Sequence, residues 1–207
     1  MAATVISRLA KRPKPKTTIR PRKKNIPDVL IYEMVRSKPI YYKGYQEVMQ
    51  GKKHAEDIMG SSFFQSLIIS RLVRVLLTCL PEVYEVLTNE LGLQFAKKHW
   101  RAADIAIYHK EQLRNIPLQN TYLDIPPKIV FEIDTKADIE QFTTPLDYYY
   151  TKTDELLAFG VEKVIWIFTE TQKTMIAEPE KDWVITNWNQ DISVIDDLHV
   201  NLSQIIA

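Results

Sequence analysis

The clearest alternation of hydrophobic and polar positions lies between residues 101 and 168. Two short runs, 101–108 and 128–134, are rich in β-branched and aromatic residues and are bounded by polar stretches, which predicts two strands. Residues 145–159 begin with a proline and end before Gly160, which predicts a helix. The nearly unbroken apolar run 163–168 is typical of a strand buried on both faces. The predicted core order is strand, strand, helix, strand.

The helix predicted at 145–159 has an apolar stripe at helical spacing, formed by Leu146, Tyr149 or Tyr150, Thr153 and Leu157. We expect this stripe to pack on the sheet. Lys152 lies at its edge and is therefore expected to reach toward the two preceding strands.

The remaining patterns predict a scaffold. They indicate two strands or a hairpin within 25–53, a long helix at 57–80, and a bent strand or strand pair at 83–95. Three short antiparallel strands at 174–177, 183–186 and 192–195 precede a closing helix at 201–206. We therefore predict one α/β (α+β) domain over residues 25–207, with a central mixed β-sheet flanked by helices and added antiparallel strands.

Acidic residues lie on the two predicted strands. Because strand side chains alternate between faces, Glu132 and Asp134 should project to one side, and Phe131 and Ile133 to the other. If the strands are neighbours, Asp104 joins the same face. Three converging carboxylates repel one another unless a cation neutralises them, and oxygen ligands suit Mg²⁺ or Mn²⁺.

The order of these residues resembles a known family. Its pattern is met by Asp104, then Glu132-Ile133-Asp134-Thr135, then Lys152, Gly160-Val161 and Val164-Ile165-Trp166. This is similar to the Uma-type restriction-endonuclease-like proteins (cyanobacterial type) of the PD-(D/E)XK nuclease superfamily, from about Pro27 to the C-terminus. The resemblance implies a restriction-endonuclease-like core.

The resemblance also implies an activity, which is metal-dependent endonuclease cleavage of phosphodiester bonds in nucleic acid, with DNA as the expected partner. Asp104 and Glu132 would be the ligands of Mg²⁺ or Mn²⁺, with the carbonyl of Ile133 as a candidate third. Lys152 would orient the nucleophile or offset charge on the phosphate.

The chain departs from the family pattern at two positions. Ala103 replaces the proline of the motif, and Asp134 stands where the E-X-K form places its lysine. The lysine role is thus open between Lys152 and Lys136, and Asp134 becomes a candidate additional ligand. We favour Lys152, because Lys136 lies beyond the predicted strand end.

Charge divides the chain into a basic tail and an acidic body. Residues 1–24 contain nine bases and no acid, which leaves 18 bases against 26 acids and a net charge of −8 for the rest. The proline-containing tail is expected to be disordered and either to contact nucleic acid or only to add solubility. A transit peptide is less favoured, since the tail is not amphipathic. The candidate contacts are Lys11, Arg12, Lys14, Arg20, Arg22, Lys23 and Lys24.

Composition argues against several other classes of binding site and against a membrane location. Five glycines provide no phosphate-binding loop, and four separated histidines with one cysteine provide no paired zinc motif. Cys79, on an apolar helix, is expected to be buried. No apolar run suits a membrane span or a secretory signal, so we expect a cytoplasmic protein without a membrane partner.

Two functional hypotheses remain open. The first is the metal-dependent nuclease, for which a homodimer is a further hypothesis because nucleases that cut both strands often pair two sites. The second is a non-catalytic nucleic-acid-binding or interaction module whose acidic site has decayed. The acidic body weighs against simple DNA binding, because such proteins usually present a basic face.

Overall fold

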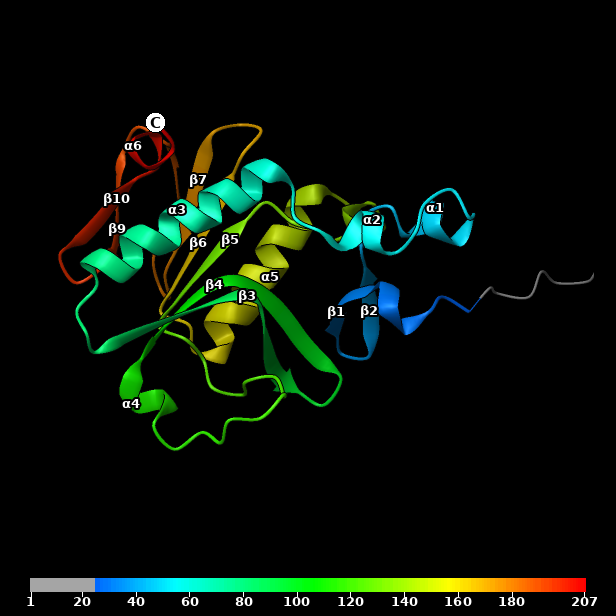
Figure 1. The fold of residues 1–207 in the computed structure, drawn as a ribbon, viewed down its shortest axis with the longest axis horizontal. Coiled ribbons are helices and arrows are strands. Elements are labelled where there is room, and N and C mark those ends of the chain that lie inside the picture. Colours follow the sequence, from blue (N-terminus) through cyan, green and yellow to red (C-terminus); the bar gives the residue numbers. More distant parts are fainter. Residues whose placement is uncertain (1–24) are drawn as a thin grey trace, which may run out of the picture.

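The computed structural model describes residues 25–207, and its centre is the predicted strand, strand, helix, strand unit (Figure 1). These elements are β4 (His99–His109), β5 (Ile129–Ile133), α5 (Pro145–Phe159) and β6 (Lys163–Phe168). Strand β5 pairs antiparallel with β4 and parallel with β6. A parallel pair needs a crossover connection, and α5 forms it.

Further strands extend this unit into a mixed eight-stranded sheet. The order is β2-β1-β4-β5-β6-β7-β8, and β3 also pairs along β4. The added strands are β1 (Ile31–Val35), β2 (Lys38–Tyr41), β3 (Tyr84–Ala96), β7 (Lys173–Ala177) and β8 (Val184–Asn187). Two C-terminal strands, β9 (Asp191–Ile195) and β10 (Leu198–Asn201), form a separate pair. The predicted fold class, a mixed sheet flanked by helices with added antiparallel strands, is confirmed.

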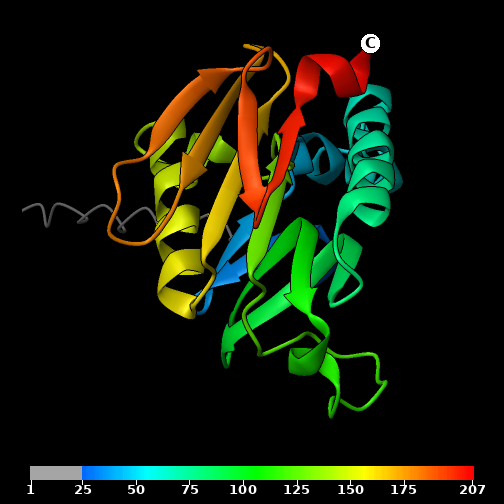
Figure 2. The same cartoon turned by 90° about the vertical axis from the view of Figure 1, so that its left-hand side faces the viewer.

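Helices cover both faces of the sheet, with α3 (Phe63–Cys79) on one side and α5 on the other (Figure 2). The shorter helices are α1 (Tyr45–Met49), α2 (Glu56–Met59), α4 (Lys110–Leu113) and α6 (Leu202–Ile206), with single 3₁₀ turns at Asp28–Leu30 and Ile139–Gln141. Within residues 25–207 none of the helices has the length and apolarity needed to span a membrane.

Strand β5 contributes to both hydrophobic cores, as its alternating pattern predicts. Phe131 and Ile133 belong to the core under α3, together with Leu72. Val130 belongs to the core under α5, together with Trp166. A side chain at position 132 on the same strand therefore points toward α5.

Helix α5 has the predicted bounds because its ends carry strong signals. Thr144 and Asp147 cap the first turn reciprocally, and Pro145 occupies the first helical position. At the other end Gly160 adopts a left-handed φ of 116°, which favours glycine.

The buried face of α5 agrees in part with the predicted stripe. Thr153 is buried and Leu157 packs against the core, as predicted, whereas Leu146 is exposed. Tyr148 and Lys152, which the stripe did not include, are also buried, because both have buried acidic partners.

The predicted helix at 57–80 is interrupted. Residues 60–62 break it, and α3 starts at Phe63 with the Ser62 hydroxyl accepting from the Gln65 amide. The prediction that Cys79 is buried is wrong, since this last residue of α3 is exposed. The buried stripe runs through Ile68, Leu72 and Leu76 at four-residue spacing, which Cys79 does not continue.

Candidate functional site

Pairing of β4 with β5 brings two of the predicted site residues together. The register places Ile105 beside Phe131, so Asp104 lies opposite Glu132. The Oδ2 atom of Asp104 accepts a hydrogen bond of 2.7 Å from the backbone amide of Ile133. A side chain thus continues the ladder between the strands, and the Asp104 carboxylate is held beside residues 132 and 133.

The two oxygens of Glu132 have different environments. Oε2 accepts a hydrogen bond of 2.8 Å from Nζ of Lys152. Oε1 is buried and has no hydrogen-bond partner within the described part of the chain. A buried carboxylate oxygen without a partner is costly, so this atom is a natural place for a cation.

Lys152 is fully buried between two acids and three aromatic rings. Its Nζ atom lies 2.8 Å from Glu132 Oε2 and 2.9 Å from Oε1 of Glu33 on β1. The rings of Tyr32, Tyr148 and Trp166 have their centroids within 6.0 Å of Nζ. Opposite charges and ring faces together keep the ammonium charged and in place, and its pKa lies above the ordinary lysine value because these carboxylates outweigh burial.

Burial dominates the electrostatics of the acid pair. It raises the pKa of Glu132 to about 8, with repulsion from Asp104 adding to the effect and Lys152 opposing it. Burial also raises the pKa of Asp104, which the hydrogen bond from Ile133 partly offsets. A divalent cation beside the two carboxylates would favour their ionised forms.

Asp134 lies apart from this pair. It follows the last residue of β5 with a left-handed φ of 53°, so strand alternation no longer sets its direction. Its carboxylate instead accepts hydrogen bonds of 2.9 Å from the amide and 2.6 Å from the hydroxyl of Thr169. The expectation that Asp134 projects beside Glu132 is therefore wrong, and the residue joins the ends of β5 and β6.

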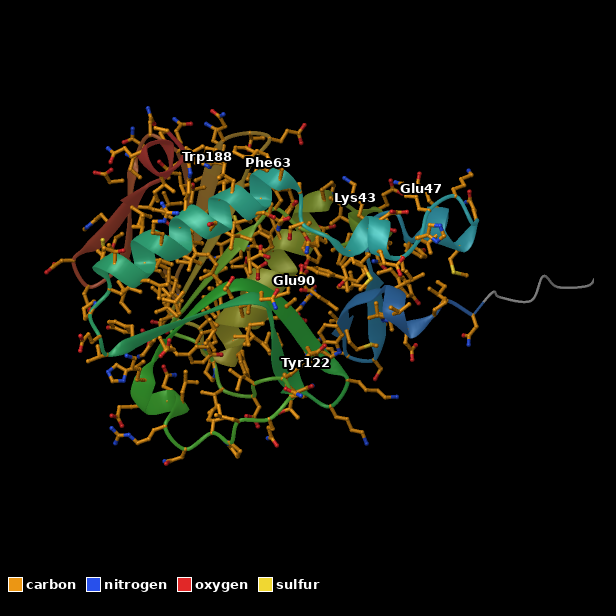
Figure 3. The ribbon with its side chains drawn as sticks, in the orientation of Figure 1. Lys43, Glu47, Phe63, Glu90, Tyr122 and Trp188 are labelled. Atoms are coloured by element: carbon orange, nitrogen blue, oxygen red, sulfur yellow. The ribbon has the colours of Figure 1, made fainter. Side chains whose placement is uncertain are left out.

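Lys136 occupies the mouth of the site. Its ammonium pairs with the carboxylate of Glu90 and donates to the Met59 carbonyl at 3.2 Å. Glu90 follows Asn89 in a bulge of β3, where both residues have positive φ (Figure 3 labels Glu90). Lys136, the alternative candidate for the lysine role, thus lies near the site but is paired with Glu90 rather than with Glu132.

Two clefts adjoin at this end of the sheet, and one of them reaches Asp104. One, of about 450 Å³, is lined by Asp104, Glu90 and Lys136. The other, of about 770 Å³, shares Gly60 and Lys136 with the first and extends along α1. Asp104 is therefore the member of the acid pair that borders open space.

The oxygen donors present fit a hard divalent cation. Among residues 25–207 no group of three His, Cys, Asp or Glu side chains lies close enough to hold a metal. The available set is two carboxylates, Asp104 and Glu132, with the backbone carbonyl of Ile133. That carbonyl accepts a hydrogen bond of 2.9 Å from Nε2 of Gln65, which fixes the direction of the carbonyl and leaves its second lone pair available to a metal. An all-oxygen set of this kind suits Mg²⁺ or Mn²⁺.

Two residues of this site were not predicted. Glu33 is completely buried on β1, and Gln65 is buried on α3. The only sequence signals are an acid between Tyr32 and Met34 in an apolar strand and a polar residue three positions before Ile68 in an apolar helix. Such residues are usually exposed, so the pattern alone does not reveal their partners. The predicted tail contacts, Lys11, Arg12, Lys14, Arg20, Arg22, Lys23 and Lys24, lie outside the described residues.

Comparison with known proteins supports the fold. No protein-family model matches the chain, and no curated protein matches it. Among solved structures it is similar to a protein from Anabaena variabilis described as "a putative nuclease belonging to DUF820". The TM-score is 0.63 at 17% identity, over 84% of this chain and 88% of that one. The two proteins share a fold.

Proposed function

We propose that this protein is a metal-dependent endonuclease that hydrolyses phosphodiester bonds of nucleic acid, with DNA as its substrate. The observation that carries the proposal is the free, buried Oε1 of Glu132 beside Asp104, with the Lys152 ammonium 2.8 Å from the other oxygen of Glu132. A fold shared with a protein described as a putative nuclease agrees with it.

Asp104, Glu132 and the Ile133 carbonyl would hold Mg²⁺ or Mn²⁺. A divalent cation bound there polarises a phosphate and lowers the pKa of a bound water. Asp104 borders the cleft, so a phosphodiester approaching through it meets this residue first. Gln65 holds the carbonyl in position, and the ladder hydrogen bond holds Asp104.

Lys152 takes the lysine role in this proposal. It is the ammonium in direct contact with Glu132, and its charge offsets negative charge that develops on the phosphate or the attacking oxygen. Lys136 lines the cleft beside Asp104 and is already paired with Glu90, so we assign it to the approach of substrate.

A cleavage assay tests the proposal. The parent chain should cut a mixture of single- and double-stranded DNA with Mg²⁺ or Mn²⁺, and not with excess chelator. Asp104→Asn keeps the size of the side chain and removes its charge, and it should lower the rate by at least about 100-fold. Thr169→Ala, which removes a hydroxyl partner of Asp134, is the matched control and should keep the parental rate. Equal rates for Asp104→Asn and the parent would refute the assignment.

Nucleases that cut both strands of a duplex often pair two such sites, so we further propose a two-fold homodimer. Light scattering should then give twice the chain mass of 24.2 kDa. A single chain mass at all working concentrations would refute the dimer and leave the metal site unaffected.

A further inference from the structure

We infer that Glu33 is a positioning residue, which supplies Lys152 with a permanent counter-charge and so leaves Glu132 available for the metal. The inference rests on the proposed function, since it concerns the same site. It adds a residue on the N-terminal hairpin, far from the acid and lysine motifs in sequence.

Glu33 is a fully satisfied buried anion. Its Oε1 lies 2.9 Å from Lys152 Nζ and accepts a hydrogen bond of 3.2 Å from the Ala102 amide. Its Oε2 accepts a hydrogen bond of 2.7 Å from the Arg101 guanidinium and one of 3.0 Å from the Tyr148 hydroxyl. Four donors on one carboxylate outweigh the cost of burial, and the pKa of Glu33 is lowered by the charges of Lys152 and Arg101.

The charges around Lys152 show why this anion is needed. Among the described residues, Glu33 and Glu132 are the carboxylates within 4.0 Å of its Nζ atom. When Glu132 binds a cation, the buried ammonium keeps a full counter-charge only from Glu33. Without it, Lys152 would compete with the metal for Glu132, because an unpaired buried charge is strongly unfavourable.

Arg101 does not depend on Glu33 in the same way. Its guanidinium also donates to Oε2 of Glu155, at 2.9 Å from Nε and 2.7 Å from NH2. Arg101 therefore has a second counter-charge in Glu155, which is not among the carboxylates that contact Lys152. This makes Glu155→Gln a matched control, since it removes an acid of the same network that does not touch the ammonium.

Mn²⁺ affinity, measured by calorimetry, tests the inference without requiring turnover. Glu33→Gln should weaken Mn²⁺ binding by about tenfold, as is usual for residues that support a metal ligand. The double variant Glu33→Gln/Lys152→Met should recover affinity to within about threefold of the parent, because the competing charge is gone. Glu155→Gln should bind Mn²⁺ like the parent.

Cleavage kinetics add a second readout. Glu33→Gln should lower kcat by about 10- to 100-fold and change KM for DNA little, because Glu33 lies beneath the site and touches no substrate. A purely structural residue would lower the melting temperature and leave the folded fraction with parental affinity and kcat, and that result would overturn the inference. So would a double variant as weak in Mn²⁺ binding as Glu33→Gln.

The remaining outcomes are also decisive. If Glu33→Gln does not fold, the added Lys152→Met change should rescue the fold by removing the unpaired charge, and an unfolded double variant would contradict the inference. If the parent binds Mn²⁺ but cuts nothing, the nuclease proposal fails while the Mn²⁺ affinities still decide the role of Glu33. A parent that binds no Mn²⁺ overturns both.

Discussion

The Nζ atom of Lys152 lies 2.8 Å from Oε2 of Glu132, a residue twenty positions earlier in the chain. The contact follows from the crossover between two parallel strands. Glu132 points toward α5 because its neighbours Phe131 and Ile133 point toward α3. Helix α5 follows β5 in the chain and packs against it, which places the buried Lys152 next to Glu132. The acid and the lysine are thus brought together by the most regular part of the fold.

The first prediction separates the two candidate lysines. Lys152→Met should lower the cleavage rate by about 100-fold, because the ammonium beside Glu132 is removed. Lys136→Met should stay within about threefold of the parent, since its charge is already paired with Glu90. Single-turnover cleavage of one DNA substrate measures both.

Lys152→Met should also destabilise the fold, by roughly 3 kcal/mol, because Glu33 loses one of its buried partners. Circular dichroism and urea unfolding serve as the control for intact variants. A fully active Lys152→Met protein together with an inactive Lys136→Met protein would reverse the assignment.

The second prediction concerns stability and pH without metal. A carboxyl whose pKa is higher in the folded than in the unfolded chain stabilises the fold only while it is protonated. For Glu132, raised from 4.5 to about 8, the contribution is complete below pH 4.5 and lost as the pH rises to about 8. This contribution should therefore lower the melting temperature of the metal-free parent protein as the pH rises from 4.5 to about 8.

Glu132→Gln should remove that part of the pH dependence, because an amide does not ionise. At about pH 8 the metal-free variant should melt at or above the temperature of the parent. Thermal unfolding in chelator at several pH values measures the difference between the two. Parallel curves for both proteins would show that Glu132 does not titrate in this window.

Sequence patterns predicted the core order and the bounds of α5, because capping residues and alternation are local signals. The signals used were Pro145, which occupies the first helical position, and Gly160, which ends the helix. Local signals also led to the error at Asp134, where alternation was extended one residue past the end of β5. Backbone direction beyond a strand depends on what the next element offers, here the Thr169 amide and hydroxyl.

Glu33 was beyond prediction for a different reason. Its partners come from β4 and α5, at separations of 68 residues to Arg101 and 115 to Tyr148. From sequence alone, an acidic residue on a strand is expected to face solvent. The four buried donors that Glu33 contacts are brought together only by the tertiary fold. The same applies to Gln65, which meets the Ile133 carbonyl across 68 residues.

The third prediction concerns the end of α5. Gly160 has φ of 116°, and an added Cβ would lie 3.0 Å from Cγ of Pro126. Gly160→Ala should cost about 1–2 kcal/mol and lower the melting temperature by a few degrees. Gly60→Ala is the control, because Gly60 has an ordinary φ of −69° and no atom within 4 Å of a Cβ. Equal melting temperatures for the two variants would show that Gly160 is not required.

The fourth prediction concerns the basic tail. Removing residues 1–24 deletes nine bases and leaves a chain of net charge −8. DNA binding should weaken, and the slope of log K against log salt should become shallower by about 0.9 for each phosphate that the tail no longer neutralises. Metal-dependent cleavage should persist at low salt. Unchanged affinity and slope would indicate that the tail serves solubility alone.

Calorimetric titration of Mn²⁺ into the parent and Glu132→Gln tests the central claim most directly, because it asks whether the unpaired buried oxygen belongs to a metal site. We expect saturable binding by the parent, and at least about 100-fold weaker binding by the variant, which keeps the size of the side chain and loses its charge. Absence of binding by the parent, or equal binding by both proteins, would contradict the claim.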